Sequence, residues 1–192
     1  FRVLAEIEAQ GERYGRSTLG LGKRVLLEFV SANPTGPLHM GHGRGAALGG
    51  ALANLLQAAG YEVTTEYYIN DAGRQMKLLA ESVEACCRKL LGQPDVGFPE
   101  DGYRGAYVEE LAQKLIAKAE AEKLDPVLSH LERLCTEEAS PLLLDEIKSD
   151  LQGFGLHFDT WFSERGLFDT GAVDRTLEVL KTQGHLFEQD GA

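Results

Sequence analysis

Two short runs of β-branched, aromatic and leucine residues flank a longer amphipathic run near the start of the chain. Residues 23–30 read KRVLLEFV and residues 62–69 read EVTTEYYI, so each run predicts a β-strand. Residues 43–59 carry leucines at helical spacing, and Gly60 follows where a helix commonly ends. This order predicts a β–α–β unit with parallel strands and a right-handed crossover. The first strand is apolar on both faces, which is typical of a central strand.

The helix expected over residues 43–59 has two interior glycines. Glycine weakens a helix interior by up to ~1 kcal/mol relative to alanine. We therefore interpret Gly49 and Gly50 as points of close packing against the sheet or a nucleotide. The apolar stripe of this helix, which is typical of a core-facing side, consists of Leu48, Leu52, Leu55, Leu56 and Ala59.

Leucine-rich helical patterns dominate the second half of the chain. Amphipathic spacing predicts helices over residues 76–90 and 107–119, then a longer helix opened by Pro126, which Pro141 should kink or break. Residues 156–162 alternate as a strand, and Asp169 or Thr170 is expected to cap a last helix. The elements together predict an α/β fold, a Rossmann-like parallel sheet with a helical insertion.

The loop between the first strand and the first helix carries the strongest chemical signal. Residues 31–44 read SANPTGPLHMGHGR, so His39 and His42 stand where the helix begins. The first turn of a helix offers unpaired N–H groups and a positive dipole end, which favour phosphate. Imidazoles there can donate hydrogen bonds to phosphate oxygens, and Gly41 lets other atoms approach. Open parallel sheets also bind ligands at this end of their strands. The alternative interpretation is a tight turn with two surface histidines.

Three more polar residues lie at the ends of the two strands. Glu28 interrupts an apolar run, and a buried carboxylate without a partner is unfavourable. It either reaches solvent at the strand end or receives a cation such as a guanidinium group. Asn70 and Asp71 follow the second strand and suit turn and helix N-cap positions.

Three blocks of sequence resemble one family. The segment LLEFVSANPTGPLHMGHGR resembles the signature region of class I aminoacyl-tRNA synthetases, specifically arginyl-tRNA synthetases, with His39 to His42 matching the family's HIGH motif. Residues 67–75, YYINDAGRQ, resemble the Y-x-N-D-x-G-x-Q run after the family's second strand. Residues 158–164, FDTWFSE, give a weaker match. The resemblance covers nearly the whole chain and places it in the N-terminal part of the catalytic domain.

The resemblance implies an arginine–tRNA ligase that uses ATP and transfers arginine to tRNA-Arg. It implies that His39 and His42 are catalytic and that Mg²⁺ arrives with ATP, without protein ligands or a metal site in this chain. Gln75 and Asn70 match the family pattern less firmly than the other residues. The implied ATP-binding residues are His39, Gly41, His42 and Gly43. The implied arginine-binding residues are Glu28, Ser31, Asn33, His42 and Gln75.

The resemblance also implies three domains or parts of domains. Residues 1–22 would be the end of a preceding N-terminal domain and a linker. Residues 23–92 would be the first half of the nucleotide-binding catalytic domain, and residues 93–192 a mostly helical continuation or insertion.

Several parts of the family pattern would lie downstream of residue 192. They are a KMSKS-like loop, the Tyr and Asp that complete the arginine pocket, and the helical domain that reads tRNA. We therefore expect the 192-residue chain alone to be inactive, with tRNA-Arg bound mainly by domains outside it. Two alternatives stay open: another class I H-x-G-H enzyme, such as a cysteine-activating ligase or an adenylyltransferase, and a non-catalytic binding module.

Charge and cysteine content argue against several classes of protein and of site. The net charge is −11, and residues 61–192 hold 26 acidic and 13 basic residues, which argues against a general nucleic-acid binder. Local basic spots such as Lys23, Arg24 and Arg44 are the exceptions. The 3 cysteines contain no C-x-x-C pair, so neither a disulfide framework nor a zinc site is indicated. No stretch has the ~20 apolar residues of a membrane span. We expect a cytoplasmic monomer without membrane contact.

Overall fold

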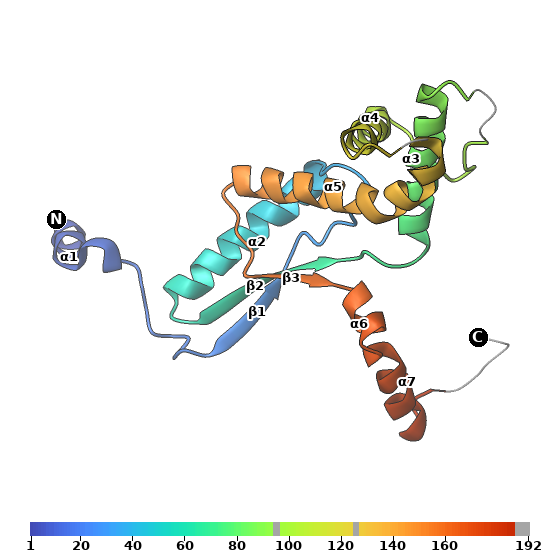
Figure 1. Cartoon of the computed structure of the whole chain (residues 1–192). Coiled ribbons are helices and arrows are strands. Elements are labelled where there is room, and N and C mark those ends of the chain that lie inside the picture. The colour runs from blue at the N-terminus through green and yellow to red at the C-terminus, as the bar shows by residue number, and fades with distance from the viewer. Residues whose placement is uncertain (94–96, 125–126, 187–192) are drawn as a thin grey trace. The chain divides into compact units, whose positions relative to one another are not determined.

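The chain folds into two compact units, each built from three separate stretches of sequence. The computed structural model describes residues 1–93, 97–124 and 127–186 (Figure 1). Unit 1 contains residues 1–31, 38–68 and 149–162. Unit 2 contains residues 32–37, 69–148 and the residues from 163 onward. The domain boundaries expected after residues 22 and 92 stay predictions.

A three-stranded sheet is formed by β1 (Arg24–Glu28), β2 (Glu62–Ile69) and β3 (Thr160–Ser163), in the order β1-β2-β3 (Figure 1). β1 and β2 pair in parallel, in a register that runs from Arg24 opposite Glu62 to Glu28 opposite Glu66. The second strand has the bounds that the sequence predicts, and the predicted parallel pairing is confirmed.

β3 runs in the same direction as β2. The Asp159 N–H donates to the Thr65 carbonyl at 3.0 Å, and the Glu164 N–H donates to the Ile69 carbonyl at 2.9 Å. The partner residue numbers rise together along both segments, which is the parallel arrangement. The predicted α/β fold with a parallel sheet is confirmed, although the third strand is shorter than the predicted 156–162.

The prediction that the first strand is central is wrong for the part of the chain that the structure describes. There β2 is the middle strand and β1 lies at the edge of the sheet. Alternate residues of β1 are exposed, and Leu26 keeps 61% of its surface. An apolar run shows that a strand has hydrophobic side chains. It does not show the position of the strand in the sheet, which depends on pairing with segments distant in sequence.

The helix α2 (Met40–Ala58) turns its small residues inward. A Cβ atom at Gly49 would lie 2.2 Å from the Phe29 ring, and one at Gly50 would lie 2.5 Å from Leu156. The predicted close packing at both glycines is confirmed, because an added Cβ would displace the Phe29 ring at Gly49 and the Leu156 side chain at Gly50. The helix is followed by Gly60 with φ +86°, as expected of a residue that ends a helix.

The leucine stripe of α2 is not the buried face. Leu48, Leu52 and Leu55 keep 70%, 41% and 67% of their surface, whereas Ala46 and Ala53 are buried together with the two glycines. The periodicity located the helix correctly. The periodicity predicted the wrong buried face, because a helix that packs closely against the sheet needs glycine and alanine at the contact rather than leucine.

Unit 1 has an aromatic core between the strands. Tyr67 is fully buried and stacks on Trp161, with ring centres 4.5 Å apart, while the edge of the Phe158 ring meets it at 5.5 Å. Phe158 also contacts Phe29 at 4.6 Å. These pairs join residues on or next to all three strands, so the third sequence block stabilises the sheet beneath the first two blocks.

Unit 2 has a helical core formed by α3 (Arg74–Leu90), α4 (Ala106–Ala121) and most of α5 (Leu131–Gly153). The predicted helices over 76–90 and 107–119 are confirmed. Most of their apolar residues are buried, but Leu90 at the end of α3 keeps 49% of its surface. The core residues are Leu79, Ala80, Val83, Cys87, Val108, Leu111, Ala112, Leu115, Leu131, Cys135, Ala139 and Leu143.

Two proline predictions have different outcomes. Pro141 lies inside α5, which continues through it, so the helix is not broken there. Pro126 lies outside the described residues. The helix is preceded by a short 3₁₀ turn, η2 (Val127–His130).

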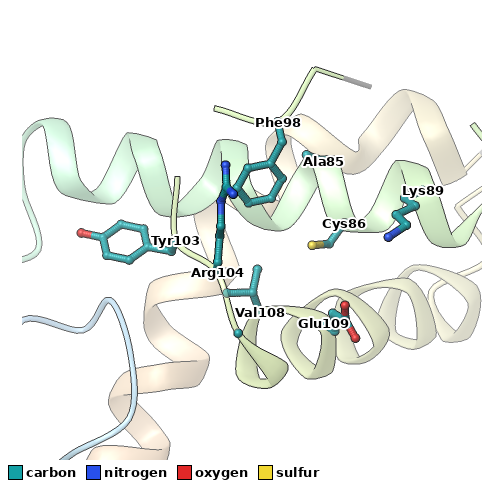
Figure 2. A pocket seen from close by; sticks show the side chains of 9 residues that line it. Ala85, Cys86, Lys89, Phe98, Tyr103, Arg104, Val108 and Glu109 are labelled. Carbon is teal, nitrogen blue, oxygen red and sulfur yellow. The ribbon is translucent and has the colours of Figure 1, made fainter. Parts of the chain in front are cut away.

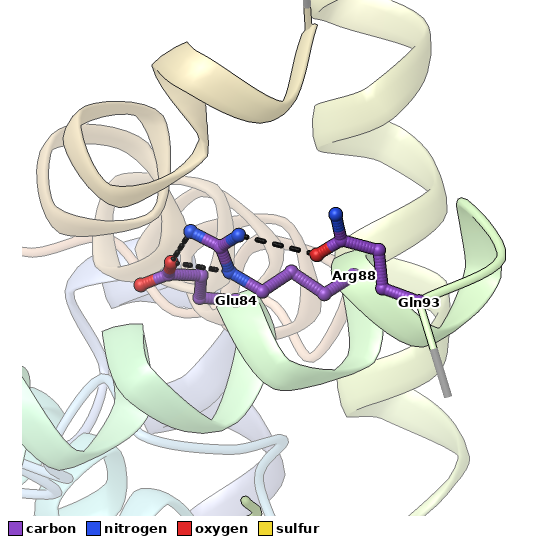
Figure 3. Close-up of polar contacts among 3 residues, drawn as sticks. All are labelled: Glu84, Arg88 and Gln93. Carbon is purple, nitrogen blue, oxygen red and sulfur yellow. Dashed lines mark hydrogen bonds and ion pairs between the residues drawn. The ribbon is translucent and has the colours of Figure 1, made fainter. Parts of the chain in front are cut away.

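The end of α3 is fixed by a polar cluster (Figure 3). The Arg88 guanidinium donates from Nε to Glu84 at 2.8 Å and from Nη1 to the side-chain carbonyl of Gln93 at 3.4 Å. Gly92 follows with φ +82°, so the helix ends where the sequence predicts. The cluster has a structural role.

The remaining helices lie near the two ends of the chain. α6 (Arg165–Asp169) was not predicted, and α7 (Ala172–Thr182) is preceded by Gly171 rather than capped by Asp169 or Thr170. The Thr170 hydroxyl instead donates back to the Gly166 carbonyl at 2.7 Å. The chain begins with α1 (Arg2–Gln10) and η1 (Gly11–Arg13). Across the described residues, each helix is too short or too polar to cross a lipid bilayer.

Candidate active site

The two histidines of the first motif cap the N-terminus of α2. His39 is the N-cap residue, and its Nδ1 accepts the Gly41 N–H at 3.1 Å. His42, in the first turn, accepts the His39 N–H on its own Nδ1 at 3.2 Å. Each imidazole therefore satisfies one backbone donor, in the reciprocal manner of a capping box.

These hydrogen bonds fix the tautomer of both rings. A neutral imidazole that accepts at Nδ1 carries its proton at Nε2. The rings stack with centres 3.8 Å apart and an interplanar angle of 22°. His39 is exposed and His42 is half-buried. The pair thus holds two Nε2–H donors beside the positive end of the α2 dipole.

The electrostatics favour an uncharged His42 ring. Burial, and to a smaller extent the neighbouring His39, lowers the pKa of His42 below its ordinary value of 6.5. Two stacked imidazolium rings would repel each other, and protonation at Nδ1 would remove the acceptor for the His39 N–H. The His42 ring is therefore suited to donate a hydrogen bond from Nε2 without adding a fixed charge.

Gly41 is required by the capping geometry. A Cβ atom at this position would lie 2.9 Å from Cε1 and 3.1 Å from Nδ1 of His39. The glycine between the histidines therefore makes room for the first ring. Gly43 and Gly45 have open space where a side chain would stand, with nothing within 4 Å.

Glu28 and Ser31 form a second polar group in unit 1. The Ser31 hydroxyl donates to Glu28 Oε1 at 2.7 Å and accepts the Tyr68 N–H at 3.1 Å. Glu28 is exposed at the end of β1, so its carboxylate is not a buried, unpaired charge. It keeps free acceptor positions for a cationic ligand.

The backbone before Ser31 is strained. The Ser31 N–H donates to the Phe29 carbonyl at 3.0 Å, which makes a three-residue γ-turn around Val30. Val30 has φ +69° and Ser31 has φ +41°, a region that a β-branched residue rarely adopts. Such strain is of order 1–3 kcal/mol and commonly occurs at functional sites.

Asn33 and Gln75 meet in unit 2. The Asn33 side-chain N–H donates to Gln75 Oε1 at 2.7 Å. The loop that carries Asn33 is held by buried Pro34 and by the Tyr107 hydroxyl, which donates to the Thr35 carbonyl at 3.0 Å. The structure thus joins two of the residues that the resemblance assigns to arginine binding.

Asp71 makes a contact that the sequence analysis missed. Its carboxylate accepts the Ser163 hydroxyl at 2.6 Å and the Arg165 N–H at 2.9 Å. The expected capping of the following helix is wrong, because α3 has Gly73 as its N-cap and no side-chain cap. These hydrogen bonds link the second and third sequence blocks. The only sequence signal for them is that each block lies at the carboxyl end of a predicted strand.

One hollow in unit 2 is lined by other residues. It has a volume of about 270 Å³ and lies in unit 2 between α3, α4 and the loop before α4 (Figure 2). The Arg104 guanidinium lies over the Phe98 ring, 5.1 Å from its centre, and half-buried Cys86 faces the space. None of the residues predicted from the motifs lines this hollow, so we do not assign the chemistry to it.

A metal centre is not visible in the part of the chain that the structure covers. The described residues include no group of three or more histidine, cysteine or acidic side chains arranged to hold a metal ion. The candidate residues of unit 1 offer the imidazole N–H groups of His39 and His42 and the Glu28 carboxylate, and those of unit 2 offer the side-chain amides of Asn33 and Gln75. This composition suits contact with phosphate and an amino acid better than direct metal ligation.

Comparisons with known proteins agree with these motifs. The family described as tRNA synthetases class I (R), catalytic domain, matches residues 3–192. An arginine–tRNA ligase of Legionella pneumophila is 44% identical over 99% of this chain, and one of Nitratidesulfovibrio vulgaris is 51% identical over 99%. The chain spans 38% and 34% of the lengths of these relatives.

Solved structures show the same relationship. A crystal structure from Campylobacter jejuni described as an arginyl-tRNA synthetase superposes with a TM-score of 0.82 and 34% identity, covering 99% of this chain and 41% of its own. The arginyl-tRNA synthetase of Thermus thermophilus superposes with a TM-score of 0.60 and 29% identity, covering 96% and 32%. The resemblance seen in the sequence is confirmed, and the chain belongs to the family of class I arginyl-tRNA synthetases, within the part described as their catalytic domain.

Proposed function

We propose that the protein carrying this chain is an arginine–tRNA ligase. It activates arginine with ATP to give arginyl-adenylate and then transfers the arginyl group to tRNA-Arg. The observation that carries the proposal is the stacked histidine pair, with both Nε2–H groups free at the N-terminus of α2. Family membership supports arginine as the amino acid.

In the first step, an oxygen of the arginine carboxylate attacks the α-phosphorus of ATP, and the bond to the pyrophosphate oxygen breaks. Such a displacement needs positioning and stabilisation of charge on the phosphate oxygens. His39 and His42 donate from Nε2 to those oxygens, and the α2 dipole adds to the attraction. Gly41 and Gly43 leave the backbone accessible to the nucleotide.

Arginine recognition falls to five residues. Glu28 pairs with a positive group of the substrate, and Ser31 orients the Glu28 carboxylate through their 2.7 Å hydrogen bond. Asn33 and Gln75 recognise the α-amino or carboxylate end, and His42 approaches the reacting carboxylate. Asn70 is a weaker candidate. A guanidinium group can pair with a carboxylate through two hydrogen bonds, which gives direction as well as charge.

In the second step, a hydroxyl of the terminal adenosine of tRNA-Arg attacks the carbonyl carbon of the adenylate and AMP leaves. The acidic balance of residues 61–192 disfavours a large RNA interface on this part of the chain. The main tRNA contacts are therefore assigned to domains outside these 192 residues. Magnesium enters with the phosphates of ATP, and we derive no step from it. We expect a cytoplasmic monomer.

The alternatives predict different ligands. A cysteine-activating ligase or an adenylyltransferase shares H-x-G-H, and a binding module needs no chemistry. Thermal shifts measured with ATP, arginine and cysteine distinguish them: stabilisation by arginine and not by cysteine supports the proposal. The family match favours arginine over the other two readings.

The direct test is arginine-dependent exchange of pyrophosphate into ATP by the full natural protein that carries these residues. His39→Ala and His42→Ala should each lower the exchange rate strongly. Met40→Leu is the matched control, because Met40 stands between the histidines and keeps 90% of its surface. Undiminished exchange in both alanine variants would remove the histidines from catalysis. We also expect no exchange by the 192-residue chain alone.

A further inference from the structure

Asp71 uses both carboxylate oxygens within the protein. Oδ2 accepts the Ser163 hydroxyl at 2.6 Å, and Oδ1 accepts the Arg165 backbone N–H at 2.9 Å. Arg165 also donates from its guanidinium to the Asp71 carbonyl at 2.9 Å. Three hydrogen bonds therefore tie the turn after β2 to the segment after β3, more than 90 residues later in the chain.

These hydrogen bonds neither cap a helix nor neutralise the charge of Asp71. Asp71 does not cap α3, whose N-cap Gly73 has φ +82° and no side-chain hydrogen bond. It also makes no salt bridge that would merely neutralise its charge, since the Arg165 guanidinium contacts the Asp71 backbone carbonyl rather than the carboxylate. What the bonds fix is the path of the backbone from β2 into the first turn of α3.

The first turn of α3 carries Gln75. Its Oε1 accepts the Asn33 side-chain N–H at 2.7 Å, and Gln75 lies only four positions after Asp71. The other described tether at this helix start is the Arg74–Asp101 ion pair at 2.8 Å, whose side chains keep 81% and 69% of their surface. An exposed pair of this kind contributes little. The packing of α3 in the helical core fixes the helix axis, and the Asp71 bonds add a polar restraint on the turn that leads into Gln75.

We propose that Asp71 is a positioning residue for arginine recognition, acting through Gln75 on Asn33. This inference rests on the proposed function. Asp71 does not contact the substrate; it holds the turn so that Gln75 keeps the Asn33 amide oriented. Its role depends on hydrogen-bond geometry and not on its negative charge.

The charge can be separated from the geometry by two substitutions. Asp71→Asn keeps Oδ1 as an acceptor for the Arg165 N–H and can donate from Nδ2 to the Ser163 hydroxyl oxygen. Asp71→Ala loses both bonds. In ATP–pyrophosphate exchange, we expect Asp71→Ala to raise the KM for arginine about tenfold, as for the loss of one hydrogen bond. Asp71→Asn should stay close to wild type, and the KM for ATP should not change.

A direct substrate contact predicts the opposite order. If the carboxylate bound a cationic group of arginine, Asp71→Asn would be as harmful as Asp71→Ala, and the proposal would be wrong. Ser163→Ala removes one bond with little change in volume and carries the test if Asp71→Ala does not fold. Asp101→Ala is the matched control, since it removes the acceptor of the Arg74 guanidinium at the start of α3, and it should leave the KM for arginine unchanged.

A double-mutant cycle tests the route of action. If Asp71 acts through Gln75, adding Asp71→Ala to Gln75→Leu should raise the KM for arginine no further than Gln75→Leu alone. Additive effects would contradict the proposal. Absence of arginine-dependent exchange in the wild-type protein would instead overturn the proposed function, and arginine binding measured by calorimetry in the same variants would then decide the role of Asp71.

Discussion

Asn33 and Gln75, which are 42 residues apart, share a 2.7 Å hydrogen bond between their side-chain amides. The bond uses one Asn33 N–H and leaves the carbonyl oxygen of that amide as an acceptor. An acceptor suits the α-ammonium group of an amino acid better than its carboxylate. The geometry therefore favours one of the two roles that the resemblance allows for Asn33.

Loss of the Gln75 acceptor should weaken arginine binding. In Gln75→Leu the Asn33 amide has no partner to fix its rotation, so we expect the KM for arginine to rise about tenfold, equivalent to ~1.4 kcal/mol, as for one hydrogen bond. The KM for ATP should stay constant. Gln75→Glu keeps an acceptor oxygen and should lose less. Exchange kinetics at varied arginine provide the measurement, and an equal rise of both constants would contradict the assignment.

His39 combines a structural and a chemical role, and one pair of substitutions separates them. Asparagine is a favoured N-cap residue, so His39→Asn should keep the stability that His39→Ala loses, about 1 kcal/mol. Both variants lack the Nε2–H donor and should lower exchange by roughly 10²–10³-fold, as for a lost transition-state donor. Thermal unfolding and exchange rates measured side by side would check this. Wild-type activity in His39→Asn would leave the ring with a capping role only.

Gly41→Ala should displace the His39 ring without unfolding α2. The added Cβ would lie 2.9 Å from Cε1 of that ring, which must move. A misplaced catalytic group lowers rates roughly ten- to hundredfold. Gly45→Ala is the control, because it meets nothing within 4 Å and should gain up to ~1 kcal/mol of helix stability. Equal exchange rates in the two variants would argue against a catalytic use of the ring position.

Gly49→Ala should destabilise unit 1 even though alanine is the better helix former. Its Cβ would lie 2.2 Å from the Phe29 ring, and overpacking of a core costs about 1–3 kcal/mol. Leu48→Ala, one position away on the exposed side of α2, should change stability by less than ~0.5 kcal/mol. Urea unfolding of both variants is the measurement. A stabilised Gly49→Ala would show that the two elements are not in close contact.

Acid stability should depend on Asp159. The Thr65 backbone N–H and then the Thr65 hydroxyl donate to this carboxylate at 2.7 and 2.9 Å, and they hold its pKa below the usual 3.8. A carboxyl group whose pKa is lower in the folded state stabilises the fold above its unfolded pKa. That contribution is lost as the pH falls through the folded value.

Thr65→Val removes the hydroxyl donor and keeps the backbone donor. We expect the pKa of Asp159 to rise toward 3.8 and the free energy of unfolding to fall near neutral pH. The difference from wild type should shrink as the pH drops below about 4, where the unfolded carboxyl is protonated. Thr64→Val, on the exposed neighbour, is the control. A difference that does not vary with pH would assign the effect to packing.

Local patterns were enough to locate most elements. β2 has its predicted bounds because alternating β-branched and aromatic residues end at turn-forming neighbours. α2 starts at Met40, three residues before the predicted Gly43, because His39 is its N-cap. The sequence did not reveal which side of α2 is buried, since Gly49 and Gly50 owe their position to Phe29 and Leu156, which lie outside the helix. Strand order failed for the same reason.

The candidate site shows the same division. The motif spacing pointed to His39 and His42, and the resemblance pointed to Gln75. The partners of Asp71 lie more than 90 residues away and leave no periodic signal. An aspartate after a strand is compatible with a local cap and with a distant tether. Only the fold distinguishes the two, because the choice depends on where β3 ends.

The interleaving of the two units has a consequence for how this chain is dissected. The polypeptide passes from one unit to the other five times between its first and last described residues. A shortened version that stops before residue 149 would retain the sequence of α3 and α4 but lose Phe158 and Trp161, the ring partners of Tyr67. Neither unit can be isolated by truncating the chain at one end. Loss of activity in a truncated variant would therefore reflect loss of folding rather than loss of a catalytic residue.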